Sequence, residues 1–103
     1  MNNAFGLENN DLEIIISVLK RYQAVAAASI FGSRAKGNFR NSSDVDIVLK
    51  GDSLTAEIVS SISYQLNEET TLPYKFDIIN YHSLNNIQLK EHIDRVGICI
   101  YPT

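Results

Sequence analysis

A glycine turn followed by two closely spaced acids is the feature that most constrains the fold of this chain. The sequence Gly-Ser-Arg-Ala-Lys-Gly occupies positions 32–37 and follows the apolar run 25–31. Ser-Asp-Val-Asp then occupies positions 43–46 and leads into the apolar residues 45–49. A carboxylate inside an apolar strand is costly unless it is paired or binds a metal. We therefore expect the turn and the acids to meet at one site.

A third acid strengthens this expectation. Asp77 lies in a second apolar run, Tyr-Lys-Phe-Asp-Ile-Ile at positions 74–79. Three acids in apolar surroundings within about a hundred residues need a ligand that repays their burial. A polyphosphate held by backbone N–H groups, together with divalent metal ions held by the acids, is one ligand that suits this pattern.

Composition indicates a single globular domain over residues 1–103. The chain is 45% hydrophobic and 20% charged, which is ordinary for such a domain. Its apolar runs are too short to span a bilayer, and no signal peptide is recognisable, so we expect a cytoplasmic protein without a membrane partner. The single cysteine, Cys99, allows no internal disulfide and is expected to be buried between two isoleucines.

Charge excludes one class of partner and points to another. The net charge of −3 argues against broad binding to nucleic acid. Three basic residues nevertheless fall within seven positions beside the glycine turn, namely Arg34, Lys36 and Arg40. Basic charge is thus concentrated where we expect phosphate groups.

The first half of the chain is expected to contain one helix and two strands. Asn10 and Glu13 are spaced as a capping box at the start of a helix. The apolar run 25–31 is typical of a buried strand, residues 33–36 of a short helical turn, and residues 44–49 of a second strand.

The second half is expected to add two helices and two strands. Asp52 or Ser53 can cap the first of these helices, and Ser83 the second, which Gly97 would end. Strands are predicted over 74–80 and 98–101. The fold class is therefore α/β, with a small mixed sheet packed against helices.

Strand geometry places the acids together. Side chains alternate between faces along a strand, so Asp44 and Asp46 share one face, about 6.6 Å apart along the backbone. Their carboxylates can lean together over a pair of metal ions about 3.5–4 Å apart. Asp77 can join them from a neighbouring strand. Mg²⁺ prefers a few carboxylate oxygens together with substrate phosphates, so two Mg²⁺ ions are the expected cofactors.

The spacing of the glycine turn and the acid pair resembles the nucleotidyltransferase superfamily of DNA polymerase β. More narrowly, it is similar to the bacterial minimal nucleotidyltransferases, of the kind that act as antitoxins beside a HEPN or substrate-binding partner. The resemblance covers nearly the whole chain, and Asp77 matches the third family acid. It implies a polymerase β palm-like core with no acceptor-binding domain of its own.

The resemblance also implies roles for individual residues. Asp44 and Asp46 would bind both metal ions, and Asp77 would bind the catalytic ion and help to activate the acceptor hydroxyl. The triphosphate would be held by residues of the turn and its surroundings, with Ser43 orienting Asp44; these nucleotide-binding candidates are Gly32, Ser33, Arg34, Lys36 and Ser43. His82 and His92 lie outside the motif and are expected to be neighbours of a helix cap or surface residues.

The implied reaction is transfer of a nucleoside monophosphate to a hydroxyl, with release of pyrophosphate. By resemblance, ATP or another nucleoside triphosphate is the donor, and the acceptor is a tyrosine of a HEPN-type toxin. Two alternatives stay open: a binding antitoxin that needs no catalysis, and transfer to a small molecule such as an aminoglycoside, completed by a partner subunit. A homodimer is also left open.

Overall fold

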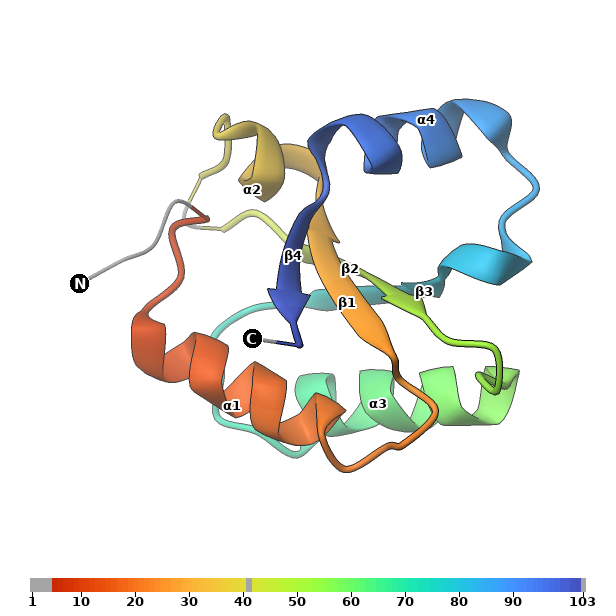
Figure 1. The fold of residues 1–103 in the computed structure, drawn as a ribbon. Coiled ribbons are helices and arrows are strands. Elements are labelled where there is room, and N and C mark those ends of the chain that lie inside the picture. The colour runs from red at the N-terminus through yellow and green to blue at the C-terminus, as the bar shows by residue number, and fades with distance from the viewer. Residues whose placement is uncertain (1–4, 41, 103) are drawn as a thin grey trace.

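The computed structural model describes residues 5–40 and 42–102. Helices and strands follow one another in the predicted order (Figure 1). Along the chain they are α1 (Asn9–Leu19), β1 (Ala27–Phe31), α2 (Gly32–Lys36), β2 (Val45–Lys50), α3 (Ala56–Glu68), β3 (Phe76–Asn80), the 3₁₀ turn η1 (Tyr81–Ser83), α4 (Ile87–Val96) and β4 (Ile98–Tyr101).

The four strands form one mixed sheet in the order β3-β2-β1-β4. β1 pairs antiparallel with β2 and with β4, whereas β2 and β3 are parallel. Parallel neighbours need a crossover connection, and α3 supplies it between β2 and β3. The predicted α/β class with a small mixed sheet is thus confirmed.

The two faces of the sheet are covered differently. α1 and α3 cover one face, and α2 and α4 lie on the other (Figure 1). Alternate β2 residues Val45, Ile47 and Leu49 are fully buried in the main core on the α1 and α3 side. On the opposite face Val48 packs with Phe31 of β1 and Ile93 of α4 in a smaller apolar cluster. The site face is therefore only partly covered.

The start of α3 differs from the sequence prediction. Thr55 caps this helix, and its hydroxyl accepts a hydrogen bond from the Ile58 N–H at 3.1 Å. Asp52 and Ser53 lie in the preceding turn, so the predicted caps are wrong by two or three residues. The Thr55 hydroxyl thus satisfies an N–H group that has no intrahelical partner in the first turn of α3.

The start of α4 also differs. Asn86 caps the helix and accepts the Leu89 N–H at 3.1 Å, while Ser83 belongs to η1. The predicted cap at Ser83 is therefore wrong, because a short 3₁₀ turn intervenes. Gly97 does end α4, but with φ −60° rather than in a left-handed conformation.

Two further local predictions fail. α1 begins at Asn9 with Glu8 at the cap position and no side-chain cap, so the expected capping box of Asn10 and Glu13 is absent from this helix start. Cys99 is exposed rather than buried, because β4 is an edge strand and the Cys99 side chain faces away from the core.

In the part of the chain that the structure describes, no helix is both long and apolar enough to cross a membrane.

Candidate active site

The structure brings the three predicted acids to one region of the sheet face opposite the main core. Asp46 of β2 and Asp77 of β3 are register partners in the parallel pair, so their side chains lie side by side on the same face. Asp44 precedes β2 by one residue and shares the face of Asp46 by alternation. Val45, between them, points into the core.

Only one of these acids is substantially buried. Asp46 is half-buried, whereas Asp44 and Asp77 are exposed, so the expectation of three buried carboxylates is wrong for the outer two. Neither Asp44 nor Asp77 belongs to the apolar cluster beneath α4. Burial, followed by the charges of Asp77 and then Asp44, raises the pKa of Asp46 from 3.8 to about 6. The three carboxylates are thus electrostatically coupled.

Gly32 joins the glycine turn directly to the acid cluster. It has φ +74°, a left-handed conformation that a residue with a Cβ adopts only at a cost. A Cβ at this position would collide with Oδ2 of Asp46. Phe31, the preceding residue, is the register partner of Asp46 across the β1–β2 pair. Both the backbone conformation and the close approach therefore require glycine here.

The remainder of the turn forms the short helix α2. Its C-terminal Gly37 has φ +85° and donates its N–H to the Ser33 carbonyl at 3.0 Å. Ser33 stands at the start of α2, where the first N–H groups of a helix have no intrahelical partner. Lys36 is exposed, so its ammonium group is accessible to a ligand.

Ser43 stabilises the turn that leads to Asp44. Its hydroxyl accepts the Arg40 N–H at 2.8 Å, and its own N–H donates to the Arg40 carbonyl at 2.9 Å. Ser43 therefore bonds to Arg40 within the turn, and its orientation of Asp44 stays a prediction.

Arg34 occupies a different environment from the one that a phosphate contact requires. It is only 1% exposed, and its Nη1 donates to the Phe5 carbonyl at 2.8 Å. Nε and Nη2 donate to the Ser43 carbonyl at 3.3 and 3.0 Å. The guanidinium is thus directed into the protein, and this position leaves the predicted phosphate contact without support.

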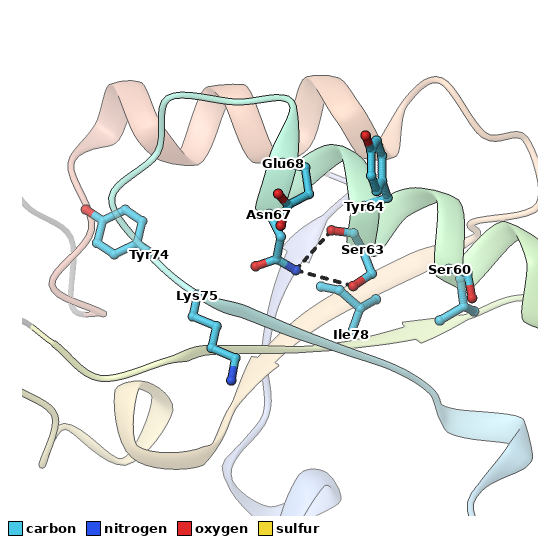
Figure 2. Close-up of a pocket in the computed structure, with 9 residues that line it drawn as sticks. Ser60, Ser63, Tyr64, Asn67, Glu68, Tyr74, Lys75 and Ile78 are labelled. Atoms are coloured by element: carbon cyan, nitrogen blue, oxygen red, sulfur yellow. Dashed lines mark hydrogen bonds between the residues drawn. The ribbon is translucent and has the colours of Figure 1, made fainter.

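Lys75 is a candidate that the sequence reasoning overlooked. It precedes β3 and stands two residues before Asp77, so alternation places both on the site face. Its side chain is exposed and points away from α3 (Figure 2). The alternation of Tyr74, Lys75, Phe76 and Asp77 carried this signal, because every second residue turns toward the acids.

A pocket of about 770 Å³ lies away from the acids, between α3 and β3 (Figure 2). Ser60, Tyr64 and Asn67 line it from α3, Ile78 lines it from β3, and Tyr74 and Lys75 line it from the segment before β3. None of the three acids is among its lining residues. The coupled carboxylates, and not this pocket, therefore define the candidate active site.

His82 has the expected surface position, whereas His92 is half-buried in a packing contact that was not predicted. His92 of α4 packs edge-on against the Phe31 ring, with 6.4 Å between the ring centroids. His82 is exposed in η1 and meets the Tyr81 ring edge-on at 5.9 Å. Neither contact involves an acid of the cluster.

The acid cluster offers the hard oxygen donors that Mg²⁺ prefers. Within residues 5–40 and 42–102, no three acidic, histidine or cysteine side chains are already gathered closely enough to hold a metal ion. The donor chemistry still fits, because burial, followed by the charges of Asp77 and Asp44, raises the pKa of Asp46, and a bound cation would favour the ionised carboxylate.

Comparison with known proteins bears on the family and the fold of this chain. The family model described as "Polymerase beta, Nucleotidyltransferase" matches residues 13–103. A search of curated proteins gives no significant match.

Several solved structures share the fold. A chain of a toxin–antitoxin complex with AMP-PNP superposes with a TM-score of 0.74 and 22% identity, covering 94% of this chain and 75% of that one. A chain of the complex of tri-AMPylated Shewanella oneidensis HEPN toxin with MNT antitoxin superposes with a TM-score of 0.71 and 18% identity, covering 94% of this chain and 74% of that one. A chain of the toxin–antitoxin MntA–HepT superposes with a TM-score of 0.69 and 18% identity, covering 93% of this chain and 74% of that one.

Proposed function

Because the chain belongs to the polymerase beta nucleotidyltransferase family, we propose that it transfers a nucleoside monophosphate, AMP from ATP, to a hydroxyl group. One observation carries the proposal. Asp44, Asp46 and Asp77 form a coupled acid cluster on one sheet face, in contact with the Gly32 turn. A chain that needed only to bind a partner would gain nothing from such a repulsive cluster.

The three acids would hold Mg²⁺, with two ions as the proposed number. Asp44 and Asp46 would contact both ions, and Asp77 the one beside the acceptor. When bound, Mg²⁺ neutralises charge on the phosphates and stabilises the attacking and leaving oxygens of an in-line displacement.

The residues of this chain bind and orient the reactants. Backbone N–H groups at Gly32 and Ser33 bind the triphosphate, and exposed Lys36 adds a positive charge at the end of α2. The acceptor oxygen forms a bond to the α-phosphorus as the bond from that phosphorus to the β-bridging oxygen breaks. Pyrophosphate leaves, and the hydroxyl proton passes to the Asp77 carboxylate, which is exposed and therefore accessible.

A tyrosine of a HEPN-type partner is the proposed acceptor, and the chain is the antitoxin of the pair. Two arguments support this choice. Structures with the same fold include toxin–antitoxin complexes, one with AMP-PNP and one with a tri-AMPylated HEPN toxin. Asp44 and Asp77 are exposed at the surface of the chain, so a protein side chain can reach them without entering a deep cleft.

Transfer of label from [α-³²P]ATP to the protein encoded beside this chain tests the proposal. The reaction would be run with Mg²⁺ or with EDTA, and with wild type, Asp44→Asn or Asp52→Asn. Asp52 is an exposed acid in the turn after β2, so its variant is a matched control. We expect labelling only with Mg²⁺, its loss in Asp44→Asn and wild-type levels in Asp52→Asn.

Other outcomes distinguish the alternatives. Tight association with the partner but no labelling under any condition would overturn the catalytic proposal in favour of a binding antitoxin. Rapid labelling of a free aminoglycoside by the chain alone would overturn the protein acceptor. Equal nucleotide affinity in Mg²⁺ and in EDTA, measured by calorimetry with AMP-PNP, would contradict the metal role.

A further inference from the structure

Arg34 links segments of the chain that are far apart in the sequence. It is one of the largest fully buried side chains among the described residues. Through Nη1 it donates to the Phe5 carbonyl, 29 residues earlier, and through Nε and Nη2 to the Ser43 carbonyl, nine residues later. A buried cation is costly, so its retention here calls for a role that these bonds serve.

Two aromatic rings enclose the same guanidinium. The Arg34 Cζ atom lies 5.2 Å from the centroid of the Phe39 ring and 5.2 Å from that of Tyr74. The Tyr74 hydroxyl in turn donates to Oδ2 of Asp11 in α1 at 2.8 Å. Tyr74 is therefore fixed at both ends of its side chain, in the segment that leads into β3 (Figure 2).

Two of the contacts of Arg34, to Ser43 and to Tyr74, lie close in sequence to acids of the candidate site. Arg34 itself directly follows Gly32 and Ser33 of the turn. Ser43 directly precedes Asp44, and Tyr74 stands three residues before Asp77. One side chain thus connects the backbone of the glycine turn to the backbones that carry two of the three acids.

We propose that Arg34 is a positioning residue for nucleotidyl transfer. It holds Asp44 and Asp77 at fixed positions relative to the Gly32–Ser33 turn, through the Ser43 carbonyl and the Tyr74 ring, and does not contact the nucleotide. This inference rests on the proposed function for its catalytic consequence. It differs from the phosphate contact that the motif suggests, because it assigns the guanidinium to the protein interior.

The contacts explain why the residue is arginine rather than lysine. A guanidinium is planar, presents five N–H donors in fixed directions and stacks on aromatic rings. Arg34 uses three of its nitrogen atoms on two carbonyls, and its Cζ lies 5.2 Å from the centroids of two aromatic rings. A lysine at this position keeps the charge but cannot satisfy both carbonyls and both rings at once.

Arg34→Lys separates positioning from direct contact. The matched control is Arg21→Lys, because Arg21 is exposed and donates to Gln65 far from the acids. We expect Arg34→Lys to bind ATP and Mg²⁺ within about threefold of wild type and to transfer AMP to the partner at least about tenfold more slowly in single turnover. Small misplacements of reacting groups have effects of this size or larger. Arg21→Lys should match wild type in both.

Two results for a folded Arg34→Lys variant would overturn the proposal. Equal losses of ATP affinity and transfer rate would mean that Arg34 contacts the nucleotide. Wild-type affinity and wild-type rate would mean that the residue only fills space.

If Arg34→Lys does not fold, a second pair of variants tests the proposal: Tyr74→Leu removes one of the two rings, and Tyr74→Phe keeps it. The same split between rate and affinity is expected for Tyr74→Leu alone, and its absence there would equally overturn the proposal.

A further measurement keeps the inference separate from the proposed function. If the wild type transfers no nucleotide, the proposed function fails on its own, and amide chemical shifts decide the positioning role. We then expect Arg34→Lys to shift the amide resonances of Asp44 and Asp77 while those of β4 stay unchanged. Shifts confined to Arg34 and its immediate neighbours would overturn the positioning role.

Discussion

Replacing Asp46 by asparagine should stabilise the protein at neutral pH when divalent metal is absent. The pKa of Asp46 is raised to about 6, from an ordinary value of 3.8, by burial and by the charges of Asp77 and Asp44. A shift of about two units corresponds to at most about 3 kcal/mol. Because the side chain is only half-buried, solvent screening reduces the expected gain to about 1–2 kcal/mol. Asparagine keeps the shape and removes the charge.

The sign of the pH dependence follows from the direction of the shift. Between about pH 4 and pH 6 the folded chain holds a proton on Asp46 that the unfolded chain has released. Wild-type stability therefore falls as the pH rises through this interval. Asp46→Asn lacks this loss, so the difference in free energy of unfolding is small below pH 4, grows up to pH 6 and is constant above it.

Urea unfolding in EDTA at pH 4 and pH 7 measures this difference directly. Asp52→Asn, at an exposed turn position, is the control and should match wild type at both pH values. A variant less stable than wild type at pH 7, or a stability difference equal at the two pH values, would refute the argument that repulsion in the acid cluster costs stability. The same Asp46→Asn variant should lose Mg²⁺-dependent binding of AMP-PNP in calorimetry.

Three further predictions concern other parts of the fold and site. Gly32→Ala should lower the free energy of unfolding by more than the roughly 1–2 kcal/mol that a left-handed alanine costs, because its Cβ also displaces Asp46. Gly37 has φ +85° and open space around it, so Gly37→Ala should lose only the cost of the left-handed backbone. Urea unfolding of the two variants compares these losses. Asp77→Asn should keep ATP affinity near wild type but slow single-turnover transfer by at least about a hundredfold, the lower limit of general-base effects. Thr55→Ala should cost about 1 kcal/mol of stability through loss of the α3 cap without changing nucleotide affinity.

The element order and the acid-bearing face could be predicted from the sequence because both follow from short-range patterns. Val45, Ile47 and Leu49 alternate with Asp46 and Val48, and a period of two can satisfy only a strand with one face in the core. The same rule placed Asp77, although pairing it with Asp46 required the register that the parallel β2–β3 ladder supplies.

Contacts between distant segments could not be predicted in this way. Arg34 beside a glycine turn is typical of a phosphate-binding residue, and nothing nearby in sequence shows that Phe5 and Tyr74 close around it. The predicted burial of Cys99 was wrong for a related reason. Its isoleucine neighbours suggested burial, but β4 lies at the edge of the sheet, so its outward side chain has no covering layer.

The exposure of Asp44 and Asp77 could not be predicted either. Both are exposed, whereas Val48 on the same sheet face is covered by Ile93 of α4, which comes from a distant segment of the chain. A sequence pattern can therefore place an acid on a face, but it cannot tell whether a helix covers that part of the face.

The two faces of β2 carry different residues, and this separation explains why the protein can carry an unfavourable acid cluster. The main core draws on Val45, Ile47 and Leu49, each fully buried on the face opposite the acids. Removing a charge from Asp46 leaves this packing intact, because Asp46 lies on the opposite face of β2 from these three residues. The charge of Asp46 therefore costs stability without being needed for folding. It follows that asparagine substitutions in the cluster should give folded proteins whose losses in binding or transfer reflect the site itself.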